Sequence, residues 1–423
     1  MRSFERGSLA AVVARLQPGM KVLLPTACGE PVSLVAEICR QADRLAPLTL
    51  MGGLHLGEYP FCRPDLAGKI RFVTWHMSPR LHEPRQRGQV NFVPIRYFDI
   101  VRVFNQGGAW QPDCVVIHTS PPDAGGYLSL GVSVSVTLGA ARRAPLVIAQ
   151  VNPRMPRTLG NAALHSSQID AWAEVDEDLL TYPVPMIGET ERAIGRHVAE
   201  LVPDGATVQV GVGTIPQAVL ESLHGKRDLS LHSLLVDSAV RLCESGVVTS
   251  AAKPFHRGRM DIGEIMGTRR VFDFAHENPA ISMESSEYVH DPTVIARLGR
   301  FVSINSALEV DLTGQVTAES VGGRQVAGIG GQFDFVLGAA LAAEGVSIIA
   351  LPSTGRGGSV SRIVPRLAPG AAVTTSRYLV DWIVTEYGAA RLAGLGEREW
   401  AAALIAVAHP RFVEEIERGR ATS

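Results

Sequence analysis

Three glycine clusters at predicted strand ends can supply backbone N–H groups to a negatively charged ligand. They lie at residues 211–216 (GVGTIP), 328–335 (GIGGQFDF) and 353–359 (STGRGGS). In the second cluster Gly328, Gly330 and Gly331 allow positive φ angles and close approach to a ligand, while Phe333 and Phe335 can anchor the following helix. Adjacent free N–H groups there would form an oxyanion or phosphate site. The alternative for each cluster is a tight turn without a ligand.

A second kind of donor is the side-chain amide of Asn305, which lies near the end of an apolar run in FVSINSALEV. The amide can point into the same cleft as the glycine loop and donate to an oxyanion, or it can form a turn with its own backbone. Other chemistries find less support. The histidines lack metal-ligand spacing, and no nucleophile elbow surrounds Ser129 or Ser133. We therefore predict neither a metal site nor a serine hydrolase.

An α/β scaffold must position these groups. Short apolar segments alternate with helical ones, for example KVLLPTA, LTLMGGL, DCVVIHTS and APLVIAQVN, then ATVQVGVG, RFVSINS and VSIIALPS. Such alternation predicts largely parallel sheets layered with helices, with ligands at the carboxyl ends of the strands. A proline-bearing stretch at 176–191 separates two similar halves. We predict an N-terminal domain at 1–185 and a C-terminal domain at 186–423.

Composition argues against several classes of partner. Forty basic and forty-two acidic side chains give a net charge of −2, too weak a field to recruit nucleic acid or an anionic membrane. No apolar stretch reaches about 18 residues and no signal region opens the chain, so we expect a cytoplasmic protein with a small-molecule partner. The five cysteines stand apart without CxxC spacing, which argues against a disulfide framework and a zinc site.

Long segments of the chain resemble the acetyl-CoA hydrolase/transferase family, most closely its 4-hydroxybutyrate or butyrate CoA-transferase branch. They include SPPDAGGYLSLGVSVS (120–135), VNPRMPRTLGN (151–161), VSINSALEVDLTGQV (302–316), GIGGQFDFVLGAA (328–340) and LPSTGRGGSVSRIVP (351–365). The resemblance covers nearly the whole chain. It implies two CoA-transferase-type α/β domains with the site between them, a homodimer, and coenzyme A bound as an acyl-CoA substrate beside a carboxylate acceptor.

In similar enzymes a glutamate side chain attacks the acyl thioester and passes through an acyl anhydride and an enzyme–CoA thioester. The resemblance implies that Asn305 and the backbone at Gly330 and Gly331 are the oxyanion donors, which agrees with the interpretation from the residues alone. The family's glutamate follows a His-Ser or His-Thr pair and stands four positions before an Asp. Here His232-Ser233 is followed by Leu-Leu-Val and Asp237, one residue shorter, and the glutamate has no counterpart.

Three hypotheses can explain the missing glutamate. In the first, the carboxylate has moved to Glu264 in DIGEIMGTRR, where relatives carry an apolar residue, or to Glu284; Glu264 can instead be an exposed edge residue or a salt-bridge partner. In the second, the enzyme hydrolyses or cleaves an acyl-CoA without a covalent intermediate, with His55 or His76 as general base. In the third, the protein binds CoA esters without turnover. We expect Asp237 to cap the helix that follows it.

The sequence therefore predicts an acyl-CoA-processing enzyme that transfers CoA between carboxylic acids of the acetate or butyrate type. The alternatives are an acyl-CoA hydrolase, a C–C cleaving enzyme or a silent CoA-ester-binding protein. The predicted catalytic residues are Asn305, Gly330, Gly331 and Glu264, and the predicted CoA-binding residues are Gly211, Gly213, Gly328 and Gln332.

Overall fold

The computed structural model of the chain describes residues 4–104, 107–108 and 110–421. The chain forms two compact units. The first comprises residues 1–183 and 261–289, and the second comprises residues 184–260 and 290–423. The chain first passes from one unit to the other between residues 183 and 184, close to the predicted boundary at 185/186. The sequence did not indicate that 261–289, which contains Glu264, folds with the first half of the chain.

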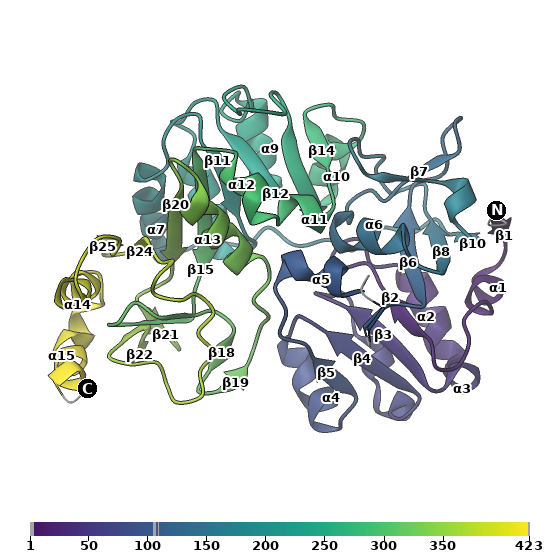
Figure 1. Cartoon of the computed structure of the whole chain (residues 1–423), viewed down its shortest axis with the longest axis horizontal. Helices are drawn as coiled ribbons and strands as arrows, with labels where there is room; N and C mark the ends of the chain where they lie inside the picture. The colour runs from purple at the N-terminus through teal and green to yellow at the C-terminus, as the bar shows by residue number, and fades with distance from the viewer. Residues whose placement is uncertain (1–3, 105–106, 109, 422–423) are drawn as a thin grey trace. The chain divides into compact units, whose positions relative to one another are not determined.

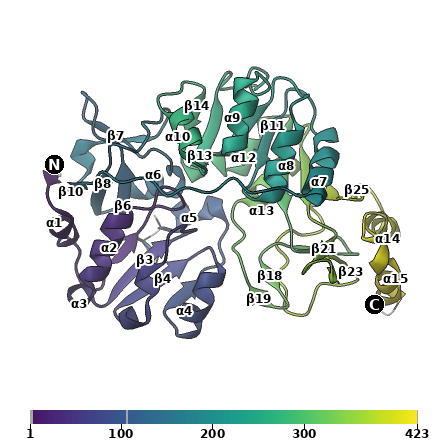
Figure 2. The ribbon, with the colours of Figure 1, turned by 180° about the vertical axis from the view of Figure 1, so that it is seen from behind.

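The first unit is built on a parallel sheet with the strand order β1-β10-β8-β6-β2-β3-β4-β5. Figures 1 and 2, seen from opposite sides, show α2 on one face of this sheet and α5 on the other. The strands of this unit are β1 (Glu5–Arg6), β2 (Lys21–Leu23), β3 (Leu48–Gly52), β4 (Ile70–Thr74), β5 (Val90–Phe92), β6 (Cys114–Thr119), β7 (Tyr127–Ser129), β8 (Leu146–Val151), β9 (Ala163–His165), β10 (Ala171–Glu174), β13 (Met260–Ile265) and β14 (Ile281–Met283). Its helices are α1 (Leu9–Val13), α2 (Val32–Arg40), α3 (Ala42–Leu45), α4 (His82–Gln86), α5 (Tyr97–Phe104), α6 (Ser135–Ala141), α10 (Arg269–Ala275) and α11 (Ser286–Val289).

Burial explains why these segments form these elements. All six residues of the central strand β6 are buried, as expected for a strand covered by helices on both faces. In α2 the buried residues include Leu34, Val35 and Ile38, whose spacing gives the helix one apolar face. This face packs into a hydrophobic core that also contains Leu50 and Phe72 from the neighbouring strands β3 and β4.

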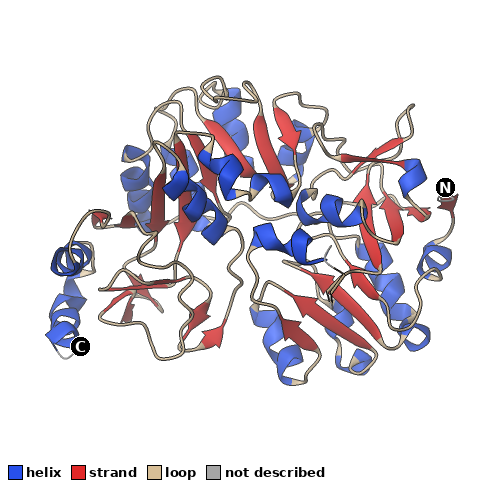
Figure 3. Cartoon of the chain, in the orientation of Figure 1, coloured by secondary structure: helices blue, strands red, loops and turns tan. Residues whose placement is uncertain are grey.

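The second unit contains parallel strands in the order β12-β11-β15-β20-β24, and β25 continues the sheet antiparallel to β24. Figures 1 and 2 show α13 on one face and α8 on the other, and the alternation of strands and helices is clear in Figure 3. Its strands are β11 (Thr207–Val210), β12 (Ser230–Leu235), β15 (Phe301–Ser306), β16 (Glu309–Asp311), β17 (Val316–Thr317), β18 (Ser320–Val321), β19 (Arg324–Gln325), β20 (Val346–Ala350), β21 (Thr354–Gly355), β22 (Val360–Ser361), β23 (Ile363–Val364), β24 (Trp382–Thr385) and β25 (Gly388–Arg391). Its helices are α7 (Glu189–Glu200), α8 (Thr214–Ser222), α9 (Asp237–Glu244), α12 (Pro292–Ala296), α13 (Gln332–Leu341), α14 (Glu397–Ala406) and α15 (Val413–Ala421).

The predicted fold class is confirmed, because both units are α/β and each is built on a largely parallel sheet layered with helices. Within the described part of the chain, no helix is long and apolar enough to cross a membrane.

Candidate functional site

The second unit gathers three of the predicted groups at one edge of its sheet. Strands β11 and β15 pair in parallel, so Gly211, directly after β11, and Asn305, near the end of β15, lie at the same carboxyl edge. Helix α13 leads into the next parallel strand, β20, and a helix in such a crossover begins at the carboxyl edge. The glycine loop before α13 therefore faces the same edge of the sheet, as ligand-binding loops do in open α/β folds.

The Asn305 amide takes part in a polar cluster with two neighbours. Its Nδ2 atom donates to Gln209 Oε1 at 3.1 Å and to Ser303 Oγ at 2.9 Å. Ser303 Oγ also donates to Gln209 Oε1 at 3.2 Å, and Gln209 Nε2 lies 3.5 Å from Asn305 Oδ1. In this arrangement both amide N–H groups of Asn305 have protein partners, so its role as an oxyanion donor stays a prediction. A concerted 180° turn of the two amides would keep the contacts and free one N–H of Asn305.

The loop before α13 keeps its N–H groups available. Within the described part of the chain, the N–H groups of Gly330 and Gly331 have no hydrogen-bond partner, and the loop is partly exposed. Gly330 has a φ of +57°, and Gly331 is the N-cap of the ten-residue helix α13. Free N–H groups at a helix N-terminus attract negative charge, and the helix dipole adds to this attraction. These features are compatible with an oxyanion site, and the role of Gly330 and Gly331 as donors stays a prediction.

Only glycine fits at position 331, because a side chain there would collide with its neighbours. A Cβ atom at this position would lie 2.4 Å from His290 Cε1 and 2.5 Å from Phe335 Cε2. The His290 ring packs on Phe335 with 4.7 Å between ring centroids, and its Nδ1 atom lies 3.8 Å from Asp334 Oδ2. Burial, followed by the charge of His232, lowers the pKa of His290 to about 3, so the ring is neutral. Sequence reasoning missed His290, which forms the wall behind the loop.

The predicted CoA-binding residues fall into two groups. Gly211 and Gly213 are partly exposed, and a Cβ atom at either position would meet open space; Gly213 has a φ of +120° at the N-cap of α8. Gly328 is partly exposed in the loop before α13, whereas Gln332 is buried and its Nε2 donates to Thr375 Oγ1 at 3.1 Å. Gln332 therefore has a protein partner, and the binding role of all four residues stays a prediction.

The segment that lacks the glutamate forms a strand with a kink. Strand β12 continues through the predicted break at His232-Ser233, where Ser233 adopts a φ of +76°. A non-glycine residue in this region costs about 1–2 kcal/mol. The N-cap of α9 is Val236, and Asp237 is the first helical residue, so the expectation that Asp237 caps this helix is wrong. A carboxylate at this first helical position is still stabilised by the positive end of the helix dipole.

Glu264 belongs to the first unit, where two hydroxyl groups orient it. Its Oε1 atom accepts hydrogen bonds from Ser133 Oγ at 3.1 Å and from Thr26 Oγ1 at 3.4 Å. Ser133 and Glu264 also form an isolated β-bridge, and a Cβ at Gly29 would lie 2.4 Å from the Ser133 Cβ. The loop that carries Thr26 thus packs tightly on Ser133, so that both hydroxyls are held against one carboxyl oxygen.

The second oxygen of Glu264 has a different environment. Oε2 is covered and has no hydrogen-bond partner within the described part of the chain. Burial raises the pKa of Glu264 to about 8, although the hydrogen bonds from Ser133 and Thr26 oppose the shift. Burial and then the nearby Glu264 carboxylate raise the pKa of Tyr97. Glu264 is therefore neither an exposed edge residue nor, in the described part of the chain, a salt-bridge partner. A perturbed, oriented carboxyl of this kind is typical of functional sites.

The two histidines proposed as general bases are poorly suited to that role. The His55 side chain is fully buried, and its Nδ1 lies 3.4 Å from Glu30 Oε2. Burial, followed by the charge of His55, lowers the pKa of His76 to about 4. A base this weak removes protons inefficiently near pH 7, because general bases work best with a pKa near the operating pH.

Comparison with known proteins is consistent with this combination of fold and site. Sequence models of the acetyl-CoA hydrolase/transferase N-terminal and C-terminal domains match residues 4–186 and 267–419. The chain belongs to the acetyl-CoA hydrolase/transferase family.

Individual relatives match over nearly their whole length. The chain is 40% identical to the 4-hydroxybutyrate coenzyme A transferase of Clostridium kluyveri, over 96% of this chain and 94% of the relative. It is 39% identical to the succinyl-CoA:cyclohexane-1-carboxylate CoA transferase of Geobacter metallireducens, over 96% and 92%. The crystal structure of RipA from Yersinia pestis matches with a TM-score of 0.94 at 33% identity, and the match covers 99% of this chain and 97% of RipA.

Proposed function

We propose that this protein transfers CoA from an acyl-CoA thioester to the carboxylate of an acceptor acid, with Glu264 as the carboxylate that forms the covalent intermediates. The relatives that match over the whole chain are named for transfer of CoA to carboxylic acids. The observation that carries the assignment of Glu264 is its asymmetric environment. Two hydroxyls hold Oε1, whereas Oε2 has no partner within the described part of the chain.

The chemistry is an exchange of carboxylates on one thioester. The Glu264 carboxylate attacks the acyl carbonyl carbon, the C–S bond breaks, and CoA leaves as a thiolate, so an acyl-glutamyl anhydride remains. The thiolate attacks the glutamyl carbonyl and releases the first acid, which leaves a glutamyl–CoA thioester. The acceptor carboxylate and the thiolate then repeat these two steps in reverse order. Water takes no part, and the covalent intermediates divide one difficult substitution into easier ones.

The hydroxyls and the donor loop have separate roles in this scheme. Thr26 and Ser133 hold Oε1, which leaves Oε2 as the attacking oxygen. Because Oε2 is covered, the thioester carbonyl must replace the groups that cover Oε2 before the attack. Negative charge then grows on the carbonyl oxygen. The N–H groups of Gly330 and Gly331, with the Asn305 amide after its turn, are proposed to stabilise that charge. The raised pKa makes the carboxylate a stronger nucleophile once it is ionised.

Hydrolysis is the second candidate, because the family includes hydrolases. The weak base at His76 and the buried pair of His55 with Glu30 disfavour hydrolysis.

We also propose that the protein acts as a cytoplasmic homodimer without a metal cofactor. Sedimentation velocity tests the dimer, and activity after dialysis against a chelator tests the metal.

The test is exchange of CoA from butyryl-CoA to isotopically labelled acetate. The wild-type protein should form labelled acetyl-CoA, and Glu264→Gln should reduce exchange by at least about 1,000-fold, because glutamine cannot form the anhydride. Release of free CoA without acetate would instead indicate a hydrolase. Binding of butyryl-CoA with neither reaction would indicate a silent binding protein.

A further inference from the structure

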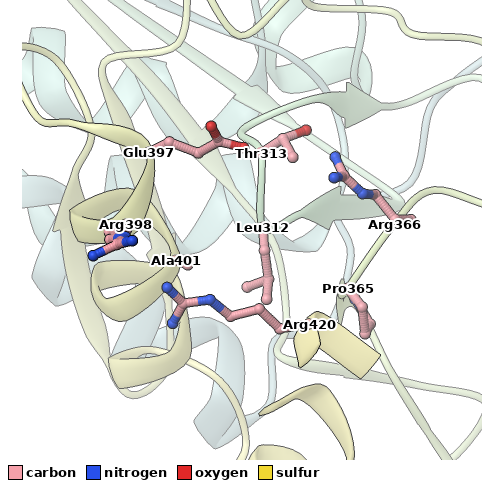
Figure 4. A pocket seen from close by; sticks show the side chains of 8 residues that line it. All are labelled: Leu312, Thr313, Pro365, Arg366, Glu397, Arg398, Ala401 and Arg420. Atoms are coloured by element: carbon pink, nitrogen blue, oxygen red, sulfur yellow. The ribbon is translucent and has the colours of Figure 1, made fainter. Parts of the chain in front are cut away.

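A cavity beside the last two helices has no part in the proposed transfer. It has a volume of about 320 Å³ and lies within the second unit. Its lining includes Arg366 after β23, Arg398 in the first turn of α14 and Arg420 in the last turn of α15. Figure 4 shows Arg366 and Arg420 on either side of Leu312. Among the lining residues that the structure describes, only Glu397 is acidic, so the cavity has a net positive charge in a chain whose net charge is −2.

These arginines differ from most others of the second unit because they have no acidic partner. Across residues 4–104, 107–108 and 110–421, no carboxylate forms an ion pair with any of the three, and none of their side chains forms a hydrogen bond. By contrast, Arg300 pairs with Glu344 at 2.9 Å and Arg391 pairs with Asp381 at 3.5 Å. Like charges that are gathered without compensation repel one another. A bound anion would remove this repulsion.

The position of Arg398 is unfavourable for the helix that carries it. Arg398 is the second residue of the ten-residue helix α14, where the helix dipole places partial positive charge. The backbone N–H groups of Glu397 and Arg398 have no hydrogen-bond partner within the described part of the chain, as is usual in the first turn of a helix. Because this turn lines the cavity, an anion there would interact with the free N–H groups as well as with the guanidinium groups.

The buried carboxylate of Asp311 fixes two walls of the cavity. Its Oδ1 atom accepts hydrogen bonds from Thr313 N at 2.9 Å and from Thr313 Oγ1 at 2.6 Å. Its Oδ2 atom accepts from Leu367 N at 3.3 Å, and Leu367 directly follows Arg366. The wall at Thr313 and the backbone that carries Arg366 are therefore held by one side chain.

Close packing fixes the helix that carries the third arginine. A Cβ atom at Gly419 would lie 2.4 Å from Pro365 Cγ, so α15 packs directly on Pro365 and brings the next residue, Arg420, to the cavity. Ile416 of α15 also shares a hydrophobic core with Leu312 of the cavity wall. The frame of the cavity is thus formed before a ligand binds, which lowers the entropic cost of binding.

We propose that this cavity binds a phosphate group, as free phosphate or as the phosphate ester of a small metabolite, through Arg366, Arg398, Arg420 and the N-terminus of α14. Guanidinium groups pair with phosphate through parallel hydrogen bonds, and guanidinium groups from three segments can contact different oxygens of one tetrahedral group. A monocarboxylate offers only two oxygens and one charge. Glu264 belongs to the other unit, so this inference does not depend on the proposed transfer of CoA.

The first test is calorimetric titration of the whole protein with inorganic phosphate at low ionic strength. Arg398→Gln and Arg420→Gln should each weaken binding by about 10-fold or more, and Glu397→Gln should tighten binding because it removes a repelling charge. All three residues are exposed, so these substitutions leave the fold intact. Arg391→Gln is the matched control, because it removes an exposed arginine of β25 outside the cavity, and it should bind as the wild type does. Equal affinity in all four variants would overturn the proposal.

The second test is thermal unfolding with different anions. Phosphate should raise the Tm of the wild-type protein by mass action, and the rise should be lost in Arg398→Gln. Glycerol 3-phosphate tests the ester: a larger rise than with phosphate identifies an ester as the ligand, and an equal rise identifies free phosphate. An equal rise with succinate would overturn the choice of phosphate. Competition between phosphate and butyryl-CoA in the titration would also overturn the proposal, because the cavity would then belong to the CoA site.

Discussion

Substitution of Glu264 by glutamine should make the protein more stable at neutral and alkaline pH while it abolishes transfer. Glutamine has nearly the same size and keeps an oxygen for the hydroxyls of Ser133 and Thr26. It removes only the group that must either ionise or hold a proton. A substitution that removes the reacting group and yet stabilises the fold is the expected signature of a functional carboxyl held in an unfavourable environment.

The magnitude follows from the pKa of about 8, against a usual value of 4.5. Below pH 4.5 the carboxyl is protonated in both the folded and the unfolded chain and has no effect. Between pH 4.5 and 8 the unfolded chain loses this proton while the fold keeps it, so the free energy of unfolding falls as the pH rises. Each pKa unit is worth about 1.4 kcal/mol, so the full effect at pH 8 is on the order of 4–5 kcal/mol.

The assay is urea unfolding of wild type and Glu264→Gln at pH values from 5 to 9. The stability of the variant relative to wild type should increase from pH 5 to pH 8 and then stay constant. Glu30→Gln is the control, because its effect on the free energy of unfolding should change with pH in the opposite direction. Burial by itself raises the pKa of Glu30, but the hydrogen bond and charge of His55 outweigh it, so the net pKa is lowered. Its contribution to stability is present above pH 4.5 and is lost as the pH falls. A stability difference for Glu264→Gln that does not change with pH would refute the raised pKa.

Three further predictions concern the donors and the competing hypothesis. Asn305→Ala should lower kcat by about 100-fold with little change in KM, because an oxyanion donor acts mainly in the transition state; an effect on KM alone, in initial-rate kinetics, would assign it to binding. Gly331→Ala should lower kcat and cost about 1–3 kcal/mol in urea unfolding, because the new methyl group collides with His290, whereas Gly211→Ala meets open space and should leave stability unchanged. His76→Asn should leave CoA exchange within about twofold of wild type, and a large loss would revive the general-base hypothesis.

The fold could be predicted because local patterns determine it. The alternation of apolar runs and helical segments is sufficient for parallel sheets, and the buried strands β6 and β15 show that the apolar runs were interpreted correctly. The glycine loop was also accessible from sequence, since Gly330 adopts the positive φ that only glycine takes without cost. These features depend on residues that are close together in the chain.

The parts of the site that the sequence did not predict depend on contacts between residues that are distant in the chain. The hydroxyls on Glu264 come from positions 131 and 238 residues away, and nothing in the local sequence of Thr26 or Ser133 indicates that they meet one carboxyl. Strand β13 places Glu264 in the first unit although it lies far beyond the predicted boundary, and the local sequence of this strand does not indicate that. Ser133 was considered only as a failed nucleophile, and its role as a donor had no signal of its own.

The most direct measurement of the central claim is chemical trapping followed by peptide mapping. Borohydride added during incubation with butyryl-CoA reduces an enzyme–CoA thioester to an alcohol, and mass spectrometry then locates the altered side chain. Our account predicts reduction at Glu264 in wild type and none in Glu264→Gln. Reduction at another carboxylate, or steady exchange of CoA with no trapped residue, would contradict it.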